Sequence, residues 1–201
     1  MTPELGHEYL DKARGGDERA FTEIVRHYEQ MVYSFSFKVC RDREYAEETL
    51  QDTFVNVYRK LGQFDGKSKF STWLYSIVAN NCLMKRRRRK LEKSSVSIDE
   101  GMLRRDNRPD GEPHREEHAA LQSWRNTPLE ETMTKELRER LDEAIQKLPV
   151  DYRLVFILRD IEGQSAEETA KIVNLTIPAV KSRLRRARVF LRRQLNDFVA
   201  S

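Results

Sequence analysis

Residues 43–90 are REYAEETLQDTFVNVYRKLGQFDGKSKFSTWLYSIVANNCLMKRRRRK, and the rest of the chain is organised around them. This stretch predicts an acidic amphipathic helix, a short loop with glycine, and a second helix that begins aromatic and ends basic. A carboxylate-rich helix face suits a basic protein partner, aromatic rings beside a loop suit unstacked bases, and the run KRRRRK suits phosphates. The three surfaces together are more informative than any one of them.

Composition favours two small helical domains over one large domain. Charged residues make up 35% of the 201 residues, which leaves few apolar residues for a single large core. The 37 Lys and Arg residues nearly balance the 33 Asp and Glu residues, but the two signs are separated along the chain, so local patches decide which partners bind. No run approaches the roughly 18 apolar residues of a membrane span, and the N-terminus lacks the apolar region of a signal peptide. We therefore expect an all-α, cytoplasmic protein without direct membrane insertion.

Capping residues and apolar spacing predict four helices in the first domain. In the acidic helix, apolar residues at three-four spacing face inward, which leaves its carboxylates outside. Gly15 and Gly16 are expected to end the first helix. The predicted N-caps of the four helices are Thr2, Asp17, Asp42 and either Ser71 or Thr72.

The two cysteines, Cys40 and Cys82, each lie among apolar helical residues. Two cysteines without a secretory signal do not suggest a disulfide framework. We expect both to be buried, reduced thiols.

A change in composition marks a flexible linker over residues 94–131, because Gly, Pro, Ser, Asp and Glu replace the apolar period. This segment contains HREEH, from His114 to His118, which matches the H-x-x-E-H pattern of one zinc-peptidase class. Such a site needs a rigid helix and a further ligand, neither of which this segment suggests. A zinc hydrolase is the competing hypothesis from another functional class, and metal analysis of the purified protein tests it. No metal or other cofactor is expected.

Residues 132–201 predict a second domain that contains a helix-turn-helix. Pro149 ends its first helix, and Ser165 with Glu168 forms a capping box. Asn174 can take the left-handed turn before a last helix capped by Thr176. Two short helices joined by a tight turn, the second one basic, are typical of DNA-binding domains.

The last helix has an apolar face and a basic face. Val180, Leu184, Ala187 and Leu191 share the apolar face, so Ser182 and Arg185 point most directly away from it. Lys181 and Arg186 flank these two, and Arg183 and Arg188 lie nearer the core edge. Seven basic residues and no acidic residue occur between positions 181 and 193, which indicates a nucleic-acid surface.

Together these features resemble the bacterial RNA polymerase sigma factors, specifically the small extracytoplasmic-function group. The motifs are AEETLQDTF (46–54) and FDGKSKFSTWLYSIVANN (64–81) in the first domain, and VKSRLRRAR (180–188) in the second. The resemblance implies a region-two domain over residues 1–93 and a region-four domain over residues 132–201. Tyr45 departs from the family pattern, which usually has Asp there, and Asn174 and Pro178 stand where Gly is usual.

The resemblance also implies partners and the residues that bind them. Core RNA polymerase, through its β′ clamp and β flap, and promoter DNA, both duplex and single-stranded, are the expected partners. The implied polymerase-binding residues are Glu47, Glu48, Gln51, Asp52 and Phe54. Those for the melted minus-ten strand are Phe64, Gly66, Lys67, Ser68, Phe70, Thr72, Trp73 and Asn80. Those for the DNA backbone are Lys85, Arg86, Arg87 and Arg88, and those for the minus-thirty-five duplex are Lys181, Ser182, Arg183, Arg185 and Arg186.

A member of this group has no catalytic residues, because the polymerase performs the chemistry. The resemblance further implies a monomer within the holoenzyme and an anti-sigma factor, often at the inner membrane, that masks the binding surfaces. Two alternatives remain open. An ordinary helix-turn-helix repressor or activator would explain the second domain but not the first, and Phe70 and Trp73 could simply close the small core under the loop.

Overall fold

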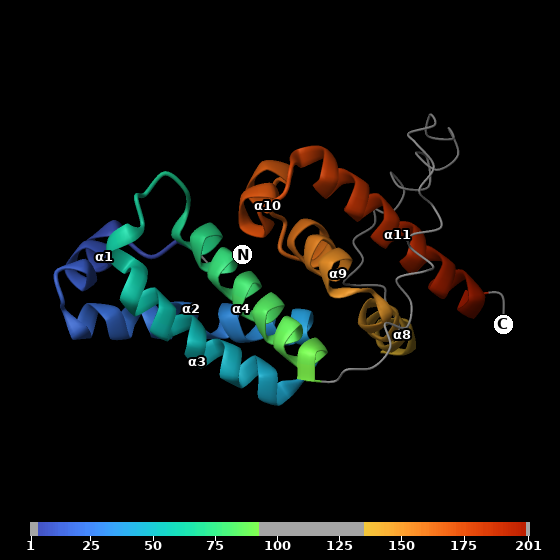
Figure 1. The fold of residues 1–201 in the computed structure, drawn as a ribbon, viewed down its shortest axis with the longest axis horizontal. Helices are drawn as coiled ribbons and strands as arrows, with labels where there is room; N and C mark the ends of the chain where they lie inside the picture. Colours follow the sequence, from blue (N-terminus) through green and yellow to red (C-terminus); the bar gives the residue numbers. More distant parts are fainter. Residues whose placement is uncertain (1–3, 93–134, 200–201) are drawn as a thin grey trace. The chain divides into compact units, whose positions relative to one another are not determined.

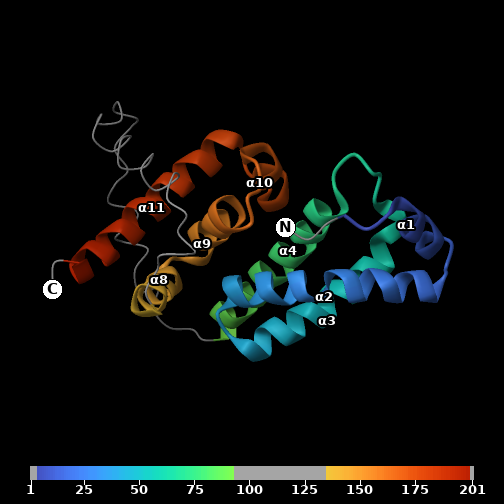
Figure 2. The same ribbon diagram turned by 180° about the vertical axis from the view of Figure 1, so that it is seen from behind.

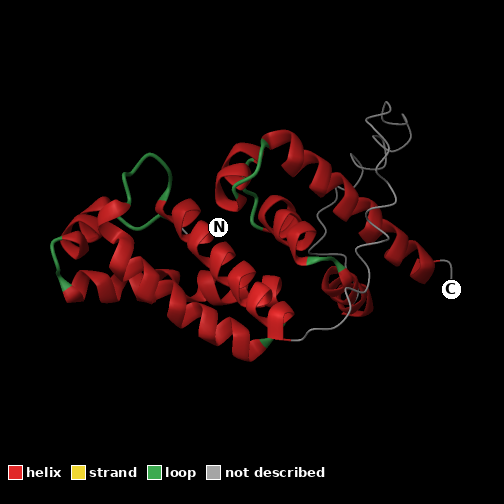
Figure 3. Ribbon diagram, in the orientation of Figure 1, coloured by secondary structure: helices red, strands yellow, loops and turns green. Residues whose placement is uncertain are grey.

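The computed structural model describes residues 4–92 and 135–199, and all regular structure in these ranges is helical, as Figure 3 shows. This confirms the all-α prediction. The elements, labelled in Figure 1, are α1 (His7–Arg14), α2 (Glu18–Cys40), α3 (Arg43–Lys60), the short 3-10 turn η1 (Leu61–Gln63), α4 (Phe70–Glu92), α8 (Lys135–Lys147), α9 (Val150–Phe156), the π-helical segment η2 (Ile157–Ile161), α10 (Ala166–Val173) and α11 (Ile177–Val199).

The described residues group into two compact units. Residues 4–92 and 148–189 form the first unit, and residues 135–147 and 190–199 form the second. Within the second unit, the Lys147 ammonium donates a hydrogen bond to the Gln194 side-chain oxygen over 3.3 Å. The domain boundaries expected from sequence, and the motif from His114 to His118, fall in residues 93–134, outside the described residues, so those boundaries stay a prediction.

Helix α2 is the centre of the first unit, where it packs against α1, α3 and α4 (Figure 2). It buries residues at the three-four spacing expected of one helical face. Burying a large apolar side chain stabilises the fold by about 1.5–3 kcal/mol, so this stripe organises the bundle. The fully buried members of the stripe are Ile24, Tyr28, Val32, Phe35 and Val39.

Two of the predicted N-caps in the first domain are confirmed. The Asp17 carboxylate accepts hydrogen bonds from the backbone N–H groups of Arg19 and Ala20, at 2.9 and 3.1 Å. The Asp42 carboxylate accepts one from the N–H of Tyr45 at 3.1 Å. Each cap satisfies N–H groups that have no partner within the helix.

The predicted caps of α1 and α4 are wrong. Residues 4–6 are not helical, and α1 begins at His7 instead of after Thr2. The Glu4 carboxylate accepts hydrogen bonds from the Tyr28 hydroxyl at 3.2 Å and from the Ser71 backbone N–H at 3.4 Å. Glu4 therefore binds the first turn of α4, a helix that already begins at Phe70. Burial, with the nearby Glu4 carboxylate, raises the pKa of Tyr28 to about 12.

The capping and turn residues predicted around α10 are confirmed. Ser165 and Glu168 form the capping box, Asn174 takes a left-handed conformation with φ 51°, and the Thr176 hydroxyl accepts a hydrogen bond from the N–H of Ala179. The positive φ at Asn174 turns the chain between α10 and α11, which is the turn of the predicted helix-turn-helix.

The turn after η2 also contacts the helices of the bundle within the first unit. The Glu162 carboxylate lies 2.8 Å from the Lys38 ammonium and accepts a hydrogen bond from the Tyr75 hydroxyl, also at 2.8 Å. Burial and the charge of Glu162 raise the pKa of Tyr75.

Candidate functional site

The exposed face of α3 carries the predicted acidic surface. Glu47, Glu48, Gln51 and Asp52 are all exposed and lie at positions that share one side of the helix. Because α3 buries its opposite side against α2 and α4, these side chains lie on the surface, where a protein partner can reach them. Phe54, grouped with them from sequence, is 9% exposed and lies in the core.

Lys85 connects this acidic face to α4. Its ammonium lies 3.0 Å from the carboxylates of both Glu48 and Asp52, and its side chain is mostly buried. Sequence analysis placed Lys85 at the start of a phosphate-binding run, but this structure uses its charge to tie two helices together. Arg86, Arg87 and Arg88 follow in α4, with side chains outside the described part.

The aromatic residues around the loop between η1 and α4 form a packed cluster. The rings of Phe64, Phe70 and Trp73 have centroids 5.3–5.5 Å apart. Phe64 and Phe70 are 4% and 3% exposed, whereas Trp73 is half-buried. The Arg14 guanidinium covers the Phe64 ring at 5.6 Å. Only Trp73 of the three can therefore offer a ring face to a base without rearrangement.

The loop itself presents a tight turn and two exposed cations, Lys67 and Lys69. Gly66 has φ 72°, a conformation that favours glycine, and the exposed Lys67 pairs with Asp65 at 2.9 Å. Hydrogen bonds from the side chain and backbone of Lys67 lower the pKa of Asp65. Ser68 is half-buried.

The two polar residues predicted on α4 differ in access. Asn80 is exposed, but Thr72 is 4% exposed, and its hydroxyl lies 3.5 Å from the Gln164 side-chain oxygen. Neighbouring Asn81 is engaged within the bundle, where its amide bonds to Thr53 and Asn56 of α3. In this arrangement Asn80 and Trp73, but not Thr72, are available to a ligand.

Helix α11 buries the apolar face that its sequence predicts. Val180, Leu184, Ala187 and Leu191 are all buried. Lys181, Ser182 and Arg185 are exposed, whereas Arg183 and Arg186 are half-buried. The exposed residues therefore form a basic strip on the side of α11 away from its core contacts.

Two arginines at the edge of this strip are held by carboxylates. Arg183 lies 4.0 Å from Asp151. Arg188 donates two hydrogen bonds to Asp160, one of them from Nε at 2.8 Å. Sequence analysis placed Arg188 nearer the core edge, and the structure pairs it there with Asp160.

Sequence reasoning missed the long-range polar contacts, namely Glu4 at α4, Lys85 at α3, and Glu162 at Tyr75 and Lys38. No local sequence pattern connects these positions. Predicting the contacts would have required information on which distant residues lie close together.

Within residues 4–92 and 135–199, no group of three or more His, Cys, Asp or Glu side chains is placed to hold a metal ion. No helix in the described ranges is long and apolar enough to cross a membrane.

Comparison with known proteins gives consistent matches along the chain. Residues 24–92 match the family described as Sigma-70 region 2, and residues 138–191 match Sigma-70, region 4. The RNA polymerase sigma-H factor of Pseudomonas aeruginosa is 31% identical over 191 residues, which cover 94% of this chain and 92% of that protein. The extracytoplasmic-function sigma factor SigW of Bacillus subtilis is 29% identical, with coverage of 94% and 95%.

A solved structure supports the same fold. It contains the sigma factor RpoE of Bartonella quintana in complex with the anti-sigma factor NepR. The TM-score is 0.63 at 23% identity, and the match covers 88% of this chain and 96% of the other.

Proposed function

This chain belongs to the extracytoplasmic-function group of the sigma-70 family of RNA polymerase sigma factors, and from this premise we propose that it binds core RNA polymerase and recognises promoters with two separate DNA-binding surfaces. Sigma factors are initiation factors, not enzymes, so the bond-forming chemistry belongs to the polymerase.

The observation that carries this proposal is the phase of α11. The apolar stripe of α11 is buried in the core. The exposed strip of Lys181, Ser182 and Arg185 on its other side can therefore enter a major groove. Arginine and lysine at a recognition helix bind guanine edges and phosphates. The capped turn between α10 and α11 holds this helix at a fixed angle to its partner helix. We assign this surface to the minus-thirty-five duplex.

The first domain supplies the other two binding surfaces. The acidic face of α3 suits a basic groove on core polymerase, because opposite charges accelerate and orient association. Trp73 and Asn80 lie on α4 with exposed surface, and they are assigned to an unpaired base of the non-template strand. Capturing that base outside the duplex favours the melted state, since stacking on an aromatic ring is worth about 1–3 kcal/mol.

The proposal includes regulation by an anti-sigma factor in the cytoplasm. The Bartonella quintana relative in the structural comparison is a sigma factor bound to such a protein. A partner that covers the acidic face of α3 would compete directly with core polymerase.

The decisive experiment is transcription in vitro with core polymerase on a genomic fragment library. Addition of the protein is expected to produce transcripts whose start sites share one pair of upstream elements. The isolated protein is expected to bind duplex DNA weakly, because two linked modules reinforce each other only when their spacing is set. Tight, sequence-specific shifts of duplex DNA by the protein alone, without stimulated transcription, would instead identify a repressor.

Arg185 and Arg188 are expected to affect promoter preference differently. Arg185 is exposed and can form a bidentate contact with guanine, which discriminates by about 1–3 kcal/mol. Arg185→Ala should therefore flatten the preference at one or two positions of the minus-thirty-five element. Arg188 is held by Asp160, so Arg188→Ala should weaken all promoters about equally.

The measurement for this pair is transcription from a saturation library of that element with each mutant holoenzyme. Each variant removes one arginine from the same helix, but only Arg188→Ala also breaks an ion pair within the protein. If Arg188→Ala reshapes the preference while Arg185→Ala only scales it, the assigned phase of α11 on DNA is wrong.

A further inference from the structure

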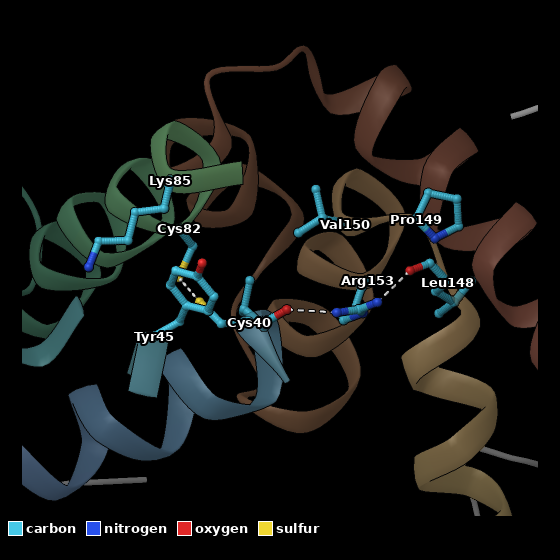
Figure 4. A pocket seen from close by; sticks show the side chains of 9 residues that line it. Cys40, Tyr45, Cys82, Lys85, Leu148, Pro149, Val150 and Arg153 are labelled. Carbon is cyan, nitrogen blue, oxygen red and sulfur yellow. Dashed lines mark hydrogen bonds between the residues drawn. The ribbon is translucent and has the colours of Figure 1, made fainter. Parts of the chain in front are cut away.

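The two cysteines of the chain meet inside the first unit. Cys40 is the last residue of α2, and Cys82 lies within α4, forty-two residues later. Their Sγ atoms are 2.9 Å apart, and both are free thiols in this structure. Figure 4 shows the two side chains pointing toward each other from neighbouring helices. A disulfide has a sulfur–sulfur distance of about 2.05 Å, so a small approach of the two side chains would allow the bond to form.

A pocket gives small molecules access to this pair. It has a volume of about 230 Å³, and both cysteines line it. About 10–15 Å³ of such volume is enough to hold one water molecule, so a small oxidant fits easily. Cys82 is buried, whereas Cys40 is partly exposed. Cys40 is therefore the sulfur that an incoming molecule reaches first.

Cationic side chains line the same pocket. Lys85 follows Cys82 by three residues on α4, and Arg153 donates a hydrogen bond to the carbonyl of Val39, next to Cys40. Positive charge stabilises a thiolate, which is the reactive form of cysteine. The hydrogen bond with Cys82 chiefly lowers the pKa of Cys40, with smaller contributions from Thr49, Lys85 and Arg153. The same hydrogen bond and burial raise the pKa of Cys82. Cys40, which is the partly exposed sulfur beside these cations, is therefore suited to attack first, and the buried Cys82 to react second.

We propose that Cys40 and Cys82 are a peroxide-sensitive dithiol that closes to an intramolecular disulfide between α2 and α4. The Cys40 thiolate attacks one oxygen of hydrogen peroxide and breaks the O–O bond. Cys40 becomes a sulfenic acid, and the released hydroxide takes a proton to become water. The Cys82 thiol then loses its proton and attacks the Cys40 sulfur, which expels the hydroxyl group as a second water. Two thiols are oxidised to one disulfide while one peroxide is reduced to two waters.

This site is distinct from the binding surfaces proposed above, but it lies beside one of them. Lys85, which holds Glu48 and Asp52 of the acidic face, also lines the pocket. Oxidation would replace the hydrogen-bonded thiol pair by a covalent link between helices that already pack together. The expected result is a more stable first unit with an unchanged fold.

Thiol counting on the full-length protein tests the proposal directly, because the chain contains only two cysteines. After reduction, treatment with hydrogen peroxide is expected to lower the free thiols from two to zero. Mass spectrometry of the intact chain should show the loss of two hydrogens with no added oxygen, and dithiothreitol should restore both thiols. The oxidised protein should unfold at a higher temperature than the reduced protein.

Single substitutions test the order of the two steps. Cys82→Ser should stop at the Cys40 sulfenic acid, which dimedone traps, whereas Cys40→Ser should react much more slowly. Circular dichroism establishes that each variant is folded, and the wild-type thiol count does not depend on either variant. The proposal fails if both wild-type thiols resist peroxide that oxidises free glutathione, if the only disulfide formed joins two chains, or if the products are sulfinic acids without a disulfide.

Discussion

Replacing both Glu48 and Asp52 by lysine is expected to abolish association with core RNA polymerase. The double substitution changes the charge of the acidic face by four units and converts attraction to a basic groove into repulsion. Close charge pairs at protein interfaces have coupling energies of roughly 1.5–7 kcal/mol, so the loss of two should weaken binding by more than about a hundredfold. The measurement is a pull-down of purified core polymerase with tagged variant and wild-type protein.

Lys85 makes a second variant necessary. Because its ammonium pairs with both carboxylates, the double substitution also places three cations together and could loosen the contact between α3 and α4. Glu47→Lys with Gln51→Lys raises the net charge of these four positions from −3 to zero and leaves both Lys85 pairs intact. This second variant should also lose the polymerase, with a thermal midpoint near that of the wild type.

A charge-matched control completes the design. Glu8→Lys with Glu29→Lys changes the net charge by the same amount as the first variant, at exposed positions of α1 and α2. The control should bind core polymerase normally. Normal recovery of polymerase by a well-folded Glu47→Lys, Gln51→Lys variant would remove α3 from the interface.

The second large effect is expected when Phe70 and Trp73 are each replaced by alanine, one at a time. Phe70 is 3% exposed and packs against Tyr28 and Phe64, so Phe70→Ala should cost about 3–5 kcal/mol of unfolding free energy. Trp73 is half-buried, so Trp73→Ala should retain the fold and core binding but reduce promoter melting. Losing the stacking of one base should make the free energy of promoter opening less favourable by about 1–3 kcal/mol.

Two readouts distinguish these roles. Thermal unfolding measures the packing contribution, and permanganate reactivity of the melted strand measures opening in the holoenzyme. Phe37→Ala serves as the control, because Phe37 is an aromatic residue of α2 with 40% exposure and lies outside the loop. A Trp73→Ala variant that unfolds as readily as Phe70→Ala, or that opens promoters normally, would place Trp73 in the core only.

The sequence predicted most of the local structure because that structure depends on neighbours a few residues apart. The caps at Asp17, Asp42 and Ser165 need only a side-chain oxygen within reach of nearby N–H groups. The phase of α11 follows from four apolar residues at helical spacing, and each of them is buried. The same short-range signals identified the acidic face of α3, whose four polar members are all exposed.

Other features required contacts between residues far apart in the chain. At the start of α4, the Ser71 N–H donates to the carboxylate of Glu4, which lies 67 residues earlier in the chain and could not be predicted from a local pattern. The access of the aromatic residues depends on packing, since Tyr28 and Arg14 cover rings that sequence alone left equally available.

By itself, the sequence determined that this protein is helical, that one helix is acidic and another basic, and that its motifs are those of a sigma factor. These properties follow from residue type and helical period, which act over one or two turns. Only the tertiary structure decided that Lys85 pairs with two carboxylates of the acidic face, that Phe64 and Phe70 are interior, and that Cys40 lies beside Cys82. The physical reason is that burial, ion pairing and thiol reactivity depend on distances across helices, and helical periodicity contains no information about which distant residues will meet.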